Sequence, residues 1–411
     1  MACILVLGMV EAIHHKPFTK KEIQAVKKSS TVLSNLLSHF PRSEFEKAVR
    51  KHKSDKGVRV LSSFDLFKTL LYGQITSAFS VREIESSLSA HAAQLYHTGM
   101  KPVSRSTLCD ALEKRSPAVF EDTFQALVAK ARILSGKAKK RFKNPLKIID
   151  ASTIELCLAR FDWAKFRSTK GAVKVHLRLD GDHFFPDQVQ MTSGAIHEVK
   201  KMADLSQEPG NIYVMDRGYV DFKRLYDINL AGSVFVTRMK GNCQYDQTRA
   251  RSFSAKEPVR FDEEIRLASE NGAKDYPEVL RRITYHDDET GKDYAFMTND
   301  LDRPAQEIAD IYKARWQVEL FFKWIKQNLK IKTFWGTSQN AVFTQIWVAL
   351  IVFMLLWISK VVDALAASPQ RILQLLKTSL LTRRSIADLL LRPSPPGRPD
   401  PYQLSLGGLR N

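Results

Sequence analysis

The segment LKIID, residues 146–150, opens the part of the chain that decides its fold. From here to about residue 240, short apolar runs separated by turn residues replace the helical spacing found upstream. Two helices are expected between these runs, around 196–205 and 222–230. Strands alternating with helices predict an α/β fold with a mixed sheet. The predicted strands are LKIID (146–150), KVHLRL (174–179), FPDQVQMT (185–192), IYVMD (212–216) and SVFVTRMK (233–240).

The sequence before this part is helical in character up to about residue 136. Apolar residues recur there at intervals of three and four, the spacing that lines one face of a helix. The clearest helices are predicted at Phe45–His52, Phe64–Tyr72, Val81–Tyr96 and Thr107–Arg115. A basic stretch, GKAKKRFK (136–143), then leads to Pro145 and marks a boundary.

The last two of these helices are separated by HTGMKPVSR (97–105), and helix-start signals precede each. Ser80 with Glu83 makes a capping box, and Ser104 occupies an N-cap position. One interpretation is a helix-turn-helix, with Lys101 and Arg105 at the start of the second helix, where phosphates are favoured. The other is a plain helical bundle with solvated cations.

Beyond residue 240 the pattern changes twice more. Residues 241–300 alternate in EPVRFDEEIRL, VLRRITYHD and DYAFMTND, which predicts an insertion of short strands. A helix is expected from Pro304 to about Lys330, followed by IWVALIVFMLLWI (346–358). This apolar run is shorter than the roughly 20 residues that span a bilayer, so we expect a buried core helix. The tail is Pro-rich.

The balance of charge points to a polyanionic partner. The chain of 411 residues carries 63 Lys and Arg against 44 Asp and Glu, a formal net charge of +19. Such an excess repels itself in a compact fold, so nucleic acid is favoured over a membrane surface or a basic protein with no such partner. With 44% hydrophobic and 26% charged residues, the composition is that of a soluble globular protein of two or three domains.

The cysteines favour a reducing, cytoplasmic location. Cys3, Cys109, Cys157 and Cys243 lie far apart and form no CxxC or Cys/His pair, which speaks against a zinc site and a disulfide framework. The opening MACILVLGMV lacks a basic n-region. It therefore favours an upstream extension of a start at Met9 over a signal peptide.

Two aspartates follow hydrophobic strands, Asp150 after LKII and Asp216 after IYVM. Side chains at the carboxyl ends of strands in an α/β sheet project into the crevice where ligands bind. A lone Asp at such a place is more often a turn or capping residue. Two in one domain make a functional pair more credible.

The segment IYKARWQVELFFKWIKQNLK (311–330) carries the strongest pattern. At about 100° per residue, Tyr312, Arg315, Glu319 and Lys326 fall within a sector of roughly 60° on one helix. A mostly apolar helix is expected to be buried, so this polar row would line a cleft. The alternative is a solvent-facing row of ion pairs. The apolar remainder of the helix consists of Trp316, Leu320, Phe321, Trp324 and Ile325.

Three acids from three separate segments suit metal-dependent phosphodiester chemistry. In-line displacement uses one ion to activate the attacking oxygen and another to stabilise the leaving one, roughly 3.5–4 Å apart. Mg²⁺ keeps several waters and accepts few protein ligands, so three carboxylates suffice. The arginine and lysine of the same row can hold flanking phosphates, and the tyrosine hydroxyl can orient a phosphate or water.

Together these blocks resemble the insertion-sequence transposases of the DDE class, in the "insertion sequence four" group. The spacing Y-x2-R-x3-E-x6-K at Tyr312, Arg315, Glu319 and Lys326 resembles the group's signature. IIDASTIEL carries the first Asp, MDRGYVDF the second, and VTRMKGN follows in the same order. The helical stretch FSVREIESSLSAHAAQLYHTGMKPVSRSTLCDALEKR also resembles one branch of the group. The resemblance covers most of residues 30 to 360.

The resemblance implies an RNase H-like mixed-sheet catalytic domain with a β-rich insertion, preceded by an all-helical N-terminal domain and followed by helices. The implied divisions are 1–30, a poorly defined N-terminal segment; 31–136, a helical DNA-binding domain; 145–240, the first part of the catalytic core; 241–300, the insertion; 301–365, the second part with the Glu helix; and 366–411, a C-terminal helical segment and Pro-rich tail.

The implied activity is cut-and-paste transposition through hairpin ends. It needs two Mg²⁺ ions per active site, for which Mn²⁺ can substitute. The implied partners are double-stranded DNA, at the terminal inverted repeats and at the target, and a second copy of the chain in a homodimeric DNA complex. A bacterial cytoplasmic, nucleoid-associated location follows, with no membrane.

Roles transfer residue by residue. The metal ligands and catalytic residues implied are Asp150, Asp216 and Glu319; the phosphate- and end-contacting residues are Tyr312, Arg315 and Lys326. An insertion-strand aromatic in these relatives stacks on a flipped base, and Tyr294 is the candidate, although the family has a Trp there. Further DNA-binding candidates are Arg238, Lys240 and Arg105.

Two other functions stay open at this stage. The chain could be a sequence-specific DNA-binding protein derived from a transposase without cleavage activity, or a metal-dependent nuclease without strand transfer. The three acids and the accompanying cations are all present, which favours an active enzyme. His176 in an alternating strand is interpreted as structural, and nothing in the spacing compels a role for His197 and Glu198.

Overall fold

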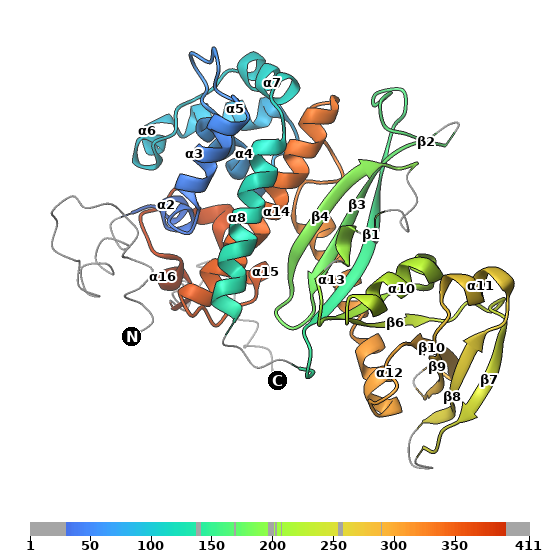
Figure 1. The fold of residues 1–411 in the computed structure, drawn as a ribbon. Helices are drawn as coiled ribbons and strands as arrows, with labels where there is room; N and C mark the ends of the chain where they lie inside the picture. The colour runs from blue at the N-terminus through green and yellow to red at the C-terminus, as the bar shows by residue number, and fades with distance from the viewer. Residues whose placement is uncertain are drawn as a thin grey trace, which may run out of the picture.

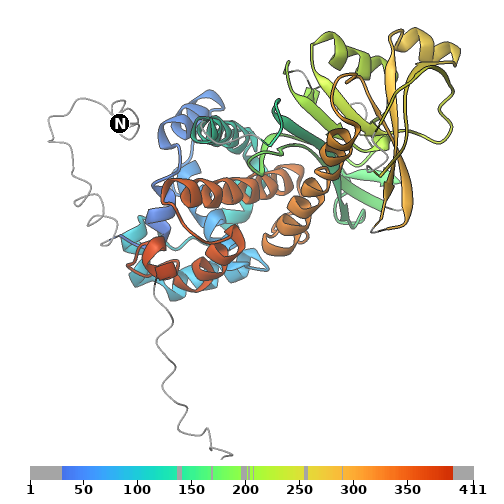
Figure 2. The same ribbon diagram turned by 90° about the horizontal axis from the view of Figure 1, so that it is seen from below.

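The computed structural model describes residues 30–136, 141–167, 170–195, 201, 204–206, 208–253, 258–288 and 290–391. These residues form two parts that lie side by side, a body of helices and a wide sheet (Figure 1, Figure 2). The predicted class, α/β with a large mixed sheet, a helical N-terminal region and C-terminal helices, is confirmed. The predicted helix at 196–205 falls largely outside the described residues, as do His197 and Glu198.

The N-terminal helices begin and end close to where the apolar spacing places them. One differs: the helix expected over Val81–Tyr96 ends at Ala90, because His91 leaves helical dihedrals (φ −103°, ψ 16°). The helices are α2 (Val32–Leu37), α3 (Arg42–Lys51), α4 (Ser63–Thr76), α5 (Val81–Ala90), α6 (Ala92–Leu95), the 3₁₀ helix η1 (Tyr96–Thr98), α7 (Arg105–Lys114) and α8 (Ala118–Ser135).

Capping explains these starts, with one departure from expectation. Ser80 accepts a hydrogen bond from the Glu83 amide at 3.2 Å, but the Glu83 carboxylate accepts from the Phe79 amide and not from that of Ser80. The α5–α7 connection contains α6 and η1, so it is longer than a helix-turn-helix turn. At the start of α7, the amide of Arg105 already donates to Glu85, so it is not free for a phosphate.

The helix α14 organises the helical part. It contacts α8, α4, α7, α2 and α15, and so joins the N-terminal helices to those at the C-terminal end. α15 and α16 close against α2, where the Val32 amide donates to the Thr382 carbonyl at 3.0 Å. We call α2–α8 with α14–α16 the helical part; the predicted domain boundaries stay predictions. The later helices are α14 (Gln339–Val362), α15 (Pro369–Ser379) and α16 (Ile386–Leu391).

α14 is a core helix, as expected for the apolar run at 346–358. By length and composition it could cross a membrane, but 94% of its most apolar window is buried inside the protein. Its one buried amide side chain, Gln345, is fully paired: it donates to the carbonyls of Lys330 and Thr333 and accepts from the Trp335 amide. Burial without an unpaired amide makes the helix compatible with the protein interior.

The sheet is mixed and continuous. Its ten strands run β2-β3-β1-β5-β6-β10-β9-β8-β7, with β4 paired to β3. β1, β5 and β6 are parallel neighbours, and the remaining pairs are antiparallel. The strands are β1 (Leu146–Leu156), β2 (Lys165–Arg167), β3 (Lys170–Asp180), β4 (Phe185–Ser193), β5 (Ile212–Met215), β6 (Val234–Arg238), β7 (Tyr245–Ala250), β8 (Val259–Leu267), β9 (Leu280–Asp287) and β10 (Lys292–Thr298).

The insertion after residue 240 extends the same sheet, because β10 pairs with β6. Helices cover both faces. α10 (Phe222–Leu230) contacts β6 and α11 (Glu270–Asp275) contacts β8, whereas α12 (Ala305–Lys313) and α13 (Trp316–Asn328) contact β6 and β1. The short η2 (Arg217–Tyr219) follows β5.

A buried ion network fixes β1, β3 and β4 to one another. Lys147 on β1 lies 2.7 Å from Asp187 on β4, and Arg178 on β3 lies 2.7 Å from the same carboxylate. Lys147 also pairs with Asp180 at 2.8 Å. Burial alone lowers the pKa of Lys147, but the charges of Asp187 and Asp180 outweigh it and raise that pKa. Asp187 thus compensates two buried cations at once.

Replacing Asp187 with Ala should lower the free energy of unfolding by about 3–5 kcal/mol, because Lys147 and Arg178 then lose a buried partner. Urea unfolding at pH 7, followed by far-UV circular dichroism, measures this change. Glu44→Ala is the control: it removes an exposed pair with Lys47 and should cost less than about 0.5 kcal/mol. Equal losses in the two variants would contradict the assigned importance of the network.

Candidate active site

Asp150 and Asp216 lie side by side because β1 and β5 are parallel neighbours. Their register pairs Ile149 with Met215, so the next residue on each segment is one of the two aspartates. Adjacent strands are about 4.8 Å apart in this direction. The prediction that Asp150 ends its strand is wrong, since β1 runs on to Leu156 along its other neighbour β3. Asp216 does follow directly after β5.

Arg315 brings Glu319 toward this pair. Its guanidinium Nη2 is 2.5 Å from Glu319 Oε1, and its Nη1 is 4.0 Å from Asp150 Oδ2. Burial would lower the pKa of Arg315, but the hydrogen bond to Glu319 and the nearby negative charges raise it overall. A charged guanidinium therefore lies between two of the three acids.

The helix expected from Pro304 to Lys330 is interrupted at Ala314 and Arg315. The amide of Arg315 donates to the Tyr312 carbonyl and that of Gln317 to the Ala314 carbonyl, both tighter i→i+3 bonds. Both linking residues keep right-handed dihedrals, so Tyr312, Arg315 and Glu319 still meet. The interruption lets α12 pack on β6 and β10 while α13 packs on β1 and α14.

Tyr312 connects the acids to the insertion strands. Its pKa is raised to about 12, chiefly by burial and also by the charge of Asp216, while Arg315 and Arg238 oppose the shift. Its ring lies 4.7 Å from that of Phe296, centroid to centroid. The guanidinium of Arg238 lies 4.8 Å from the ring centroid of Tyr294. Tyrosines and arginines thus alternate from the insertion toward the acids.

The remaining predicted cations lie farther along or elsewhere. Lys326 Nζ donates to the carbonyl of Thr153, three residues beyond Asp150 on β1, and burial followed by the charge of Lys332 lowers its pKa. Lys240 donates to the Val220 carbonyl and lines a separate cavity of about 390 Å³. Arg105 lines a larger cavity between the sheet and the helical part. Lys240 and Arg105 therefore stand apart from the acids.

Residues 141–355, just over half of the chain, match the family model described as the transposase DDE domain. The chain belongs to the DDE transposase family. Residues 28–101 of the transposase match a domain of unknown function. Its membership of the DDE family makes this transposase a DNA-cleaving and strand-transfer enzyme that binds DNA. Enzymes of this family generally use divalent metal ions.

Relatives with the same description lie in several bacteria. A putative transposase, y4zB, from Sinorhizobium fredii (strain NBRC 101917 / NGR234) is 33% identical over 311 residues, covering 72% of this chain and 85% of that protein. A probable transposase for insertion sequence element IS5377 from Geobacillus stearothermophilus is 32% identical over 219 residues, 53% of this chain and 57% of that one. A solved piggyBac transposase synaptic complex with hairpin DNA aligns over 90% of this chain and 82% of that one, with a TM-score of 0.45 and 11% identity.

The three acids fit a divalent metal by chemistry, since carboxylate oxygens are the ligands that Mg²⁺ and Mn²⁺ prefer. Their present spacing is not that of a closed site. Within the described residues, no three carboxylate, imidazole or thiol groups are gathered closely enough to enclose a metal ion. The Arg315 guanidinium pairs with Glu319 and lies near Asp150.

Two features of the site were not predicted from the sequence. Trp316 and Leu320, expected on the buried side of α13, are 58% and 44% exposed beside Glu319. Helical periodicity counts them as apolar, but the sheet and α14 cover only the side that carries Phe321 and Ile325. Arg82, Arg160 and Lys332 join Arg105 around its cavity. They come from three distant segments, so no local spacing could identify them.

His176 lies next to the site but is part of the core. It pairs with Ala151 in the β1–β3 register, is fully buried, and its Nε2 is 2.8 Å from Thr192 Oγ1. Burial, followed by the charges of Lys174 and Lys201, lowers its pKa to about 4.

Since the folded-state pKa of His176 lies below its unfolded value, its contribution to stability is complete above about pH 6.5 and is lost as the pH falls toward 4. Urea unfolding of wild type and of His176→Gln at pH 7, 5.5 and 4 tests this. Between pH 7 and pH 4, the free energy of unfolding of the wild type should fall by about 3 kcal/mol more than that of the variant, at about 1.4 kcal/mol per pKa unit. Parallel pH profiles would show that His176 does not stay neutral in the fold.

Proposed function

We propose that this transposase binds the terminal inverted repeats of its own element as duplex DNA, cuts them through hairpin intermediates, and joins the ends to target DNA. The main support is the β1–β5 register, which puts Asp150 and Asp216 next to each other at one edge of the parallel strands. Glu319 is tied to the same place through Arg315. A DNA-joining enzyme needs acids gathered from separate segments in this way.

In this proposal, Asp150, Asp216 and Glu319 are the catalytic residues and hold two Mg²⁺ ions, which Mn²⁺ can replace. When bound, such ions activate the attacking oxygen and stabilise the leaving oxygen of a phosphodiester. Arg315 is the residue that must respond, because its guanidinium now pairs with Glu319. A DNA phosphate offers that guanidinium an alternative anion and so releases Glu319 for the metal.

The side chains around the acids have suitable free donors for a phosphate. The Nε–H of Arg315 is buried without a hydrogen-bond partner among the described residues. Tyr312, with its pKa raised to about 12, keeps its phenol proton at neutral pH and can donate it to a phosphate oxygen. Lys326 and Arg238 add positive charge on either side, and Tyr294 offers an aromatic face next to Arg238. We assign these five residues to DNA contact.

Pairing two transposon ends calls for two active sites, so we propose a homodimer in the DNA complex. Cytoplasmic, nucleoid-associated activity follows from the same substrate. Lys240 and Arg105, which lie apart from the acids, would contact DNA outside the cut site.

Asp216→Asn should reduce nicking of a duplex that carries the element's terminal repeat by about 10³-fold or more in Mg²⁺ or Mn²⁺, because the variant loses a metal ligand. The assay follows labelled DNA on denaturing gels, with gel shift and circular dichroism to verify binding and folding. Asp221→Asn is a matched control five residues away. Asp221 caps α10 through the Arg224 amide, a role that Asn also fills, so cleavage should be retained.

Cleavage by Asp216→Asn at the wild-type rate would remove Asp216 from the catalytic set. A wild-type protein that shifts the repeat but cuts it with neither metal would instead identify a DNA-binding derivative. Joining of the cut end to a target plasmid separates the transposase from a simple nuclease.

A further inference from the structure

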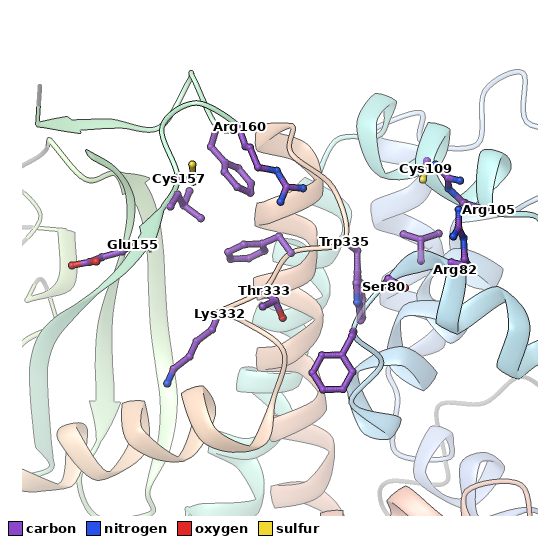
Figure 3. A pocket seen from close by; sticks show the side chains of 15 residues that line it. Ser80, Arg82, Arg105, Cys109, Glu155, Cys157, Arg160, Lys332, Thr333 and Trp335 are labelled. Atoms are coloured by element: carbon purple, nitrogen blue, oxygen red, sulfur yellow. The ribbon is translucent and has the colours of Figure 1, made fainter. Parts of the chain in front are cut away.

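A cavity of about 680 Å³ lies between the sheet and the helical part (Figure 3). One wall is the end of β1 and the residues after it, up to Phe161. The opposite wall is made by the starts of α5 and α7, and the floor by the loop Lys332–Trp335 after α13. We call this cavity the interdomain cleft. It is the place where the two parts of the molecule present side chains to a common space.

The interdomain cleft is strongly basic. Arg82, Arg105, Arg160 and Lys332 line it, and all four are exposed. Within the described chain they form no ion pair, whereas many other surface cations do. The one acid in the lining, Glu155, points its carboxylate toward the sheet side and away from the arginines (Figure 3). Uncompensated cations converging from separate elements favour a polyanion.

Aromatic side chains accompany these charges, and one of them is largely exposed. Phe79 is 71% exposed, and the Lys330 ammonium lies 3.6 Å from the centroid of its ring. Phe161 and Phe334 meet edge to face on the sheet side, 6.2 Å apart. Cations interleaved with aromatic rings are typical of surfaces that bind nucleic acid, and less so of surfaces that bind a small inorganic anion.

The floor of the cleft is held in place before any ligand arrives. Trp335 donates its indole N–H to the Ala78 carbonyl at 3.0 Å, and Gln74 donates to the Lys330 carbonyl at 3.1 Å. Gly73 leaves room for the Trp335 ring, since a Cβ there would come within 3.0 Å of it. These bonds tie the loop to the helical part. The backbone that carries Lys332 therefore keeps its place against the helical part.

β1 connects the cleft to the catalytic acids. Asp150 and Leu156 are on this one strand, six residues apart, which corresponds to about 20 Å. Lys326 lies between them, bonded to Thr153. Phosphates on one strand of duplex DNA are spaced about 3.4 Å apart along the axis. The cleft is thus about six base pairs from the acids.

We propose that the interdomain cleft binds the phosphate backbone of the substrate duplex about six base pairs from the position of cutting. Lys326 contacts the backbone between the two places. Arg82 and Arg105 reach it from the helical part, Arg160 reaches it from the sheet side, and Lys332 reaches it from the loop after α13. One DNA segment is then gripped by both parts of the protein. The proposal rests on the proposed function, since it takes the acids as the place of cutting.

The test compares two double variants. The cleft variant combines Arg82→Glu and Arg105→Glu, and the control variant combines Lys360→Glu and Arg371→Glu. The control pair has the same charge change on exposed residues: Lys360 lies about 30 Å along α14 from its first turn, and Arg371 lies in the first turn of α15. Binding of a labelled 30-base-pair duplex is measured by anisotropy in EDTA from 50 to 300 mM salt. Arg82→Gln combined with Arg105→Gln removes the two positive charges without adding negative ones, and circular dichroism verifies that every variant is folded.

The cleft double variant should bind about 10- to 100-fold more weakly at 100 mM salt, and its slope of log K against log salt should shrink by about 1.8, from two lost phosphate contacts. The neutral variant should change in the same direction by less, and the control pair by less than about threefold. In a series of duplexes shortened toward the cleavage position, the wild-type protein should bind more weakly once fewer than about six base pairs remain on the cleft side. The affinity of the cleft double variant should not depend on this length.

An unchanged affinity and salt slope in the double variant would overturn the proposal that the cleft binds DNA. An equal loss of affinity in the control pair would also overturn it. Because binding is read without metal, this result is independent of cleavage. A protein that binds through the cleft but never cuts would uphold the cleft and reject the proposed function. Normal cleavage by the wild type, together with DNA binding that the cleft mutations do not change, would uphold the proposed function and reject the cleft.

Discussion

The site depends on one constraint: two like charges are held next to each other by the backbone. The β1–β5 register fixes Asp150 beside Asp216, and hydrogen bonds across the sheet prevent them from separating. Neighbouring carboxylates repel each other unless cations or solvent compensate. In the present arrangement the guanidinium of Arg315 lies 4.0 Å from Asp150 and pairs with Glu319. The backbone thus concentrates negative charge at this edge of the sheet, which favours a cation there.

The rest of the molecule holds that edge of the sheet in place. The buried network around Asp187 locks β1, β3 and β4, while α13 covers β1 and passes directly into the loop that α14 secures through Gln345. α14 in turn assembles the helical part around itself. The apolar side chains of α14 therefore pack both within the helical part and against α13 and β4 of the sheet. This explains why a helix of 24 residues without an internal charge until Lys360 belongs to the interior of this fold.

Much of this could be predicted from local pattern. Alternation located β3, β4 and β8–β10, and capping serines located α5 and α7, because these signals depend on neighbours in sequence. The three acids were proposed from apparent strand ends and helical spacing, which are also local, although the strand that carries Asp150 continues to Leu156. The break at Ala314–Arg315 was missed, since it results from two helices packing on different surfaces. The exposure of Trp316 and the basic cleft were missed for a related reason: both depend on which elements meet in space.

The pairing of β10 with β6 makes the insertion strands part of one hydrogen-bonded sheet with the strands that carry the aspartates. The backbones of Tyr294 and Asp150 therefore keep a separation that is set by the strands between them. A duplex that contacts both Tyr294 and Asp150 must adapt its own shape to this fixed distance. Sequences that unstack or kink easily then cost less to accommodate. Such a sheet would select its DNA partly by stiffness, without reading a base edge.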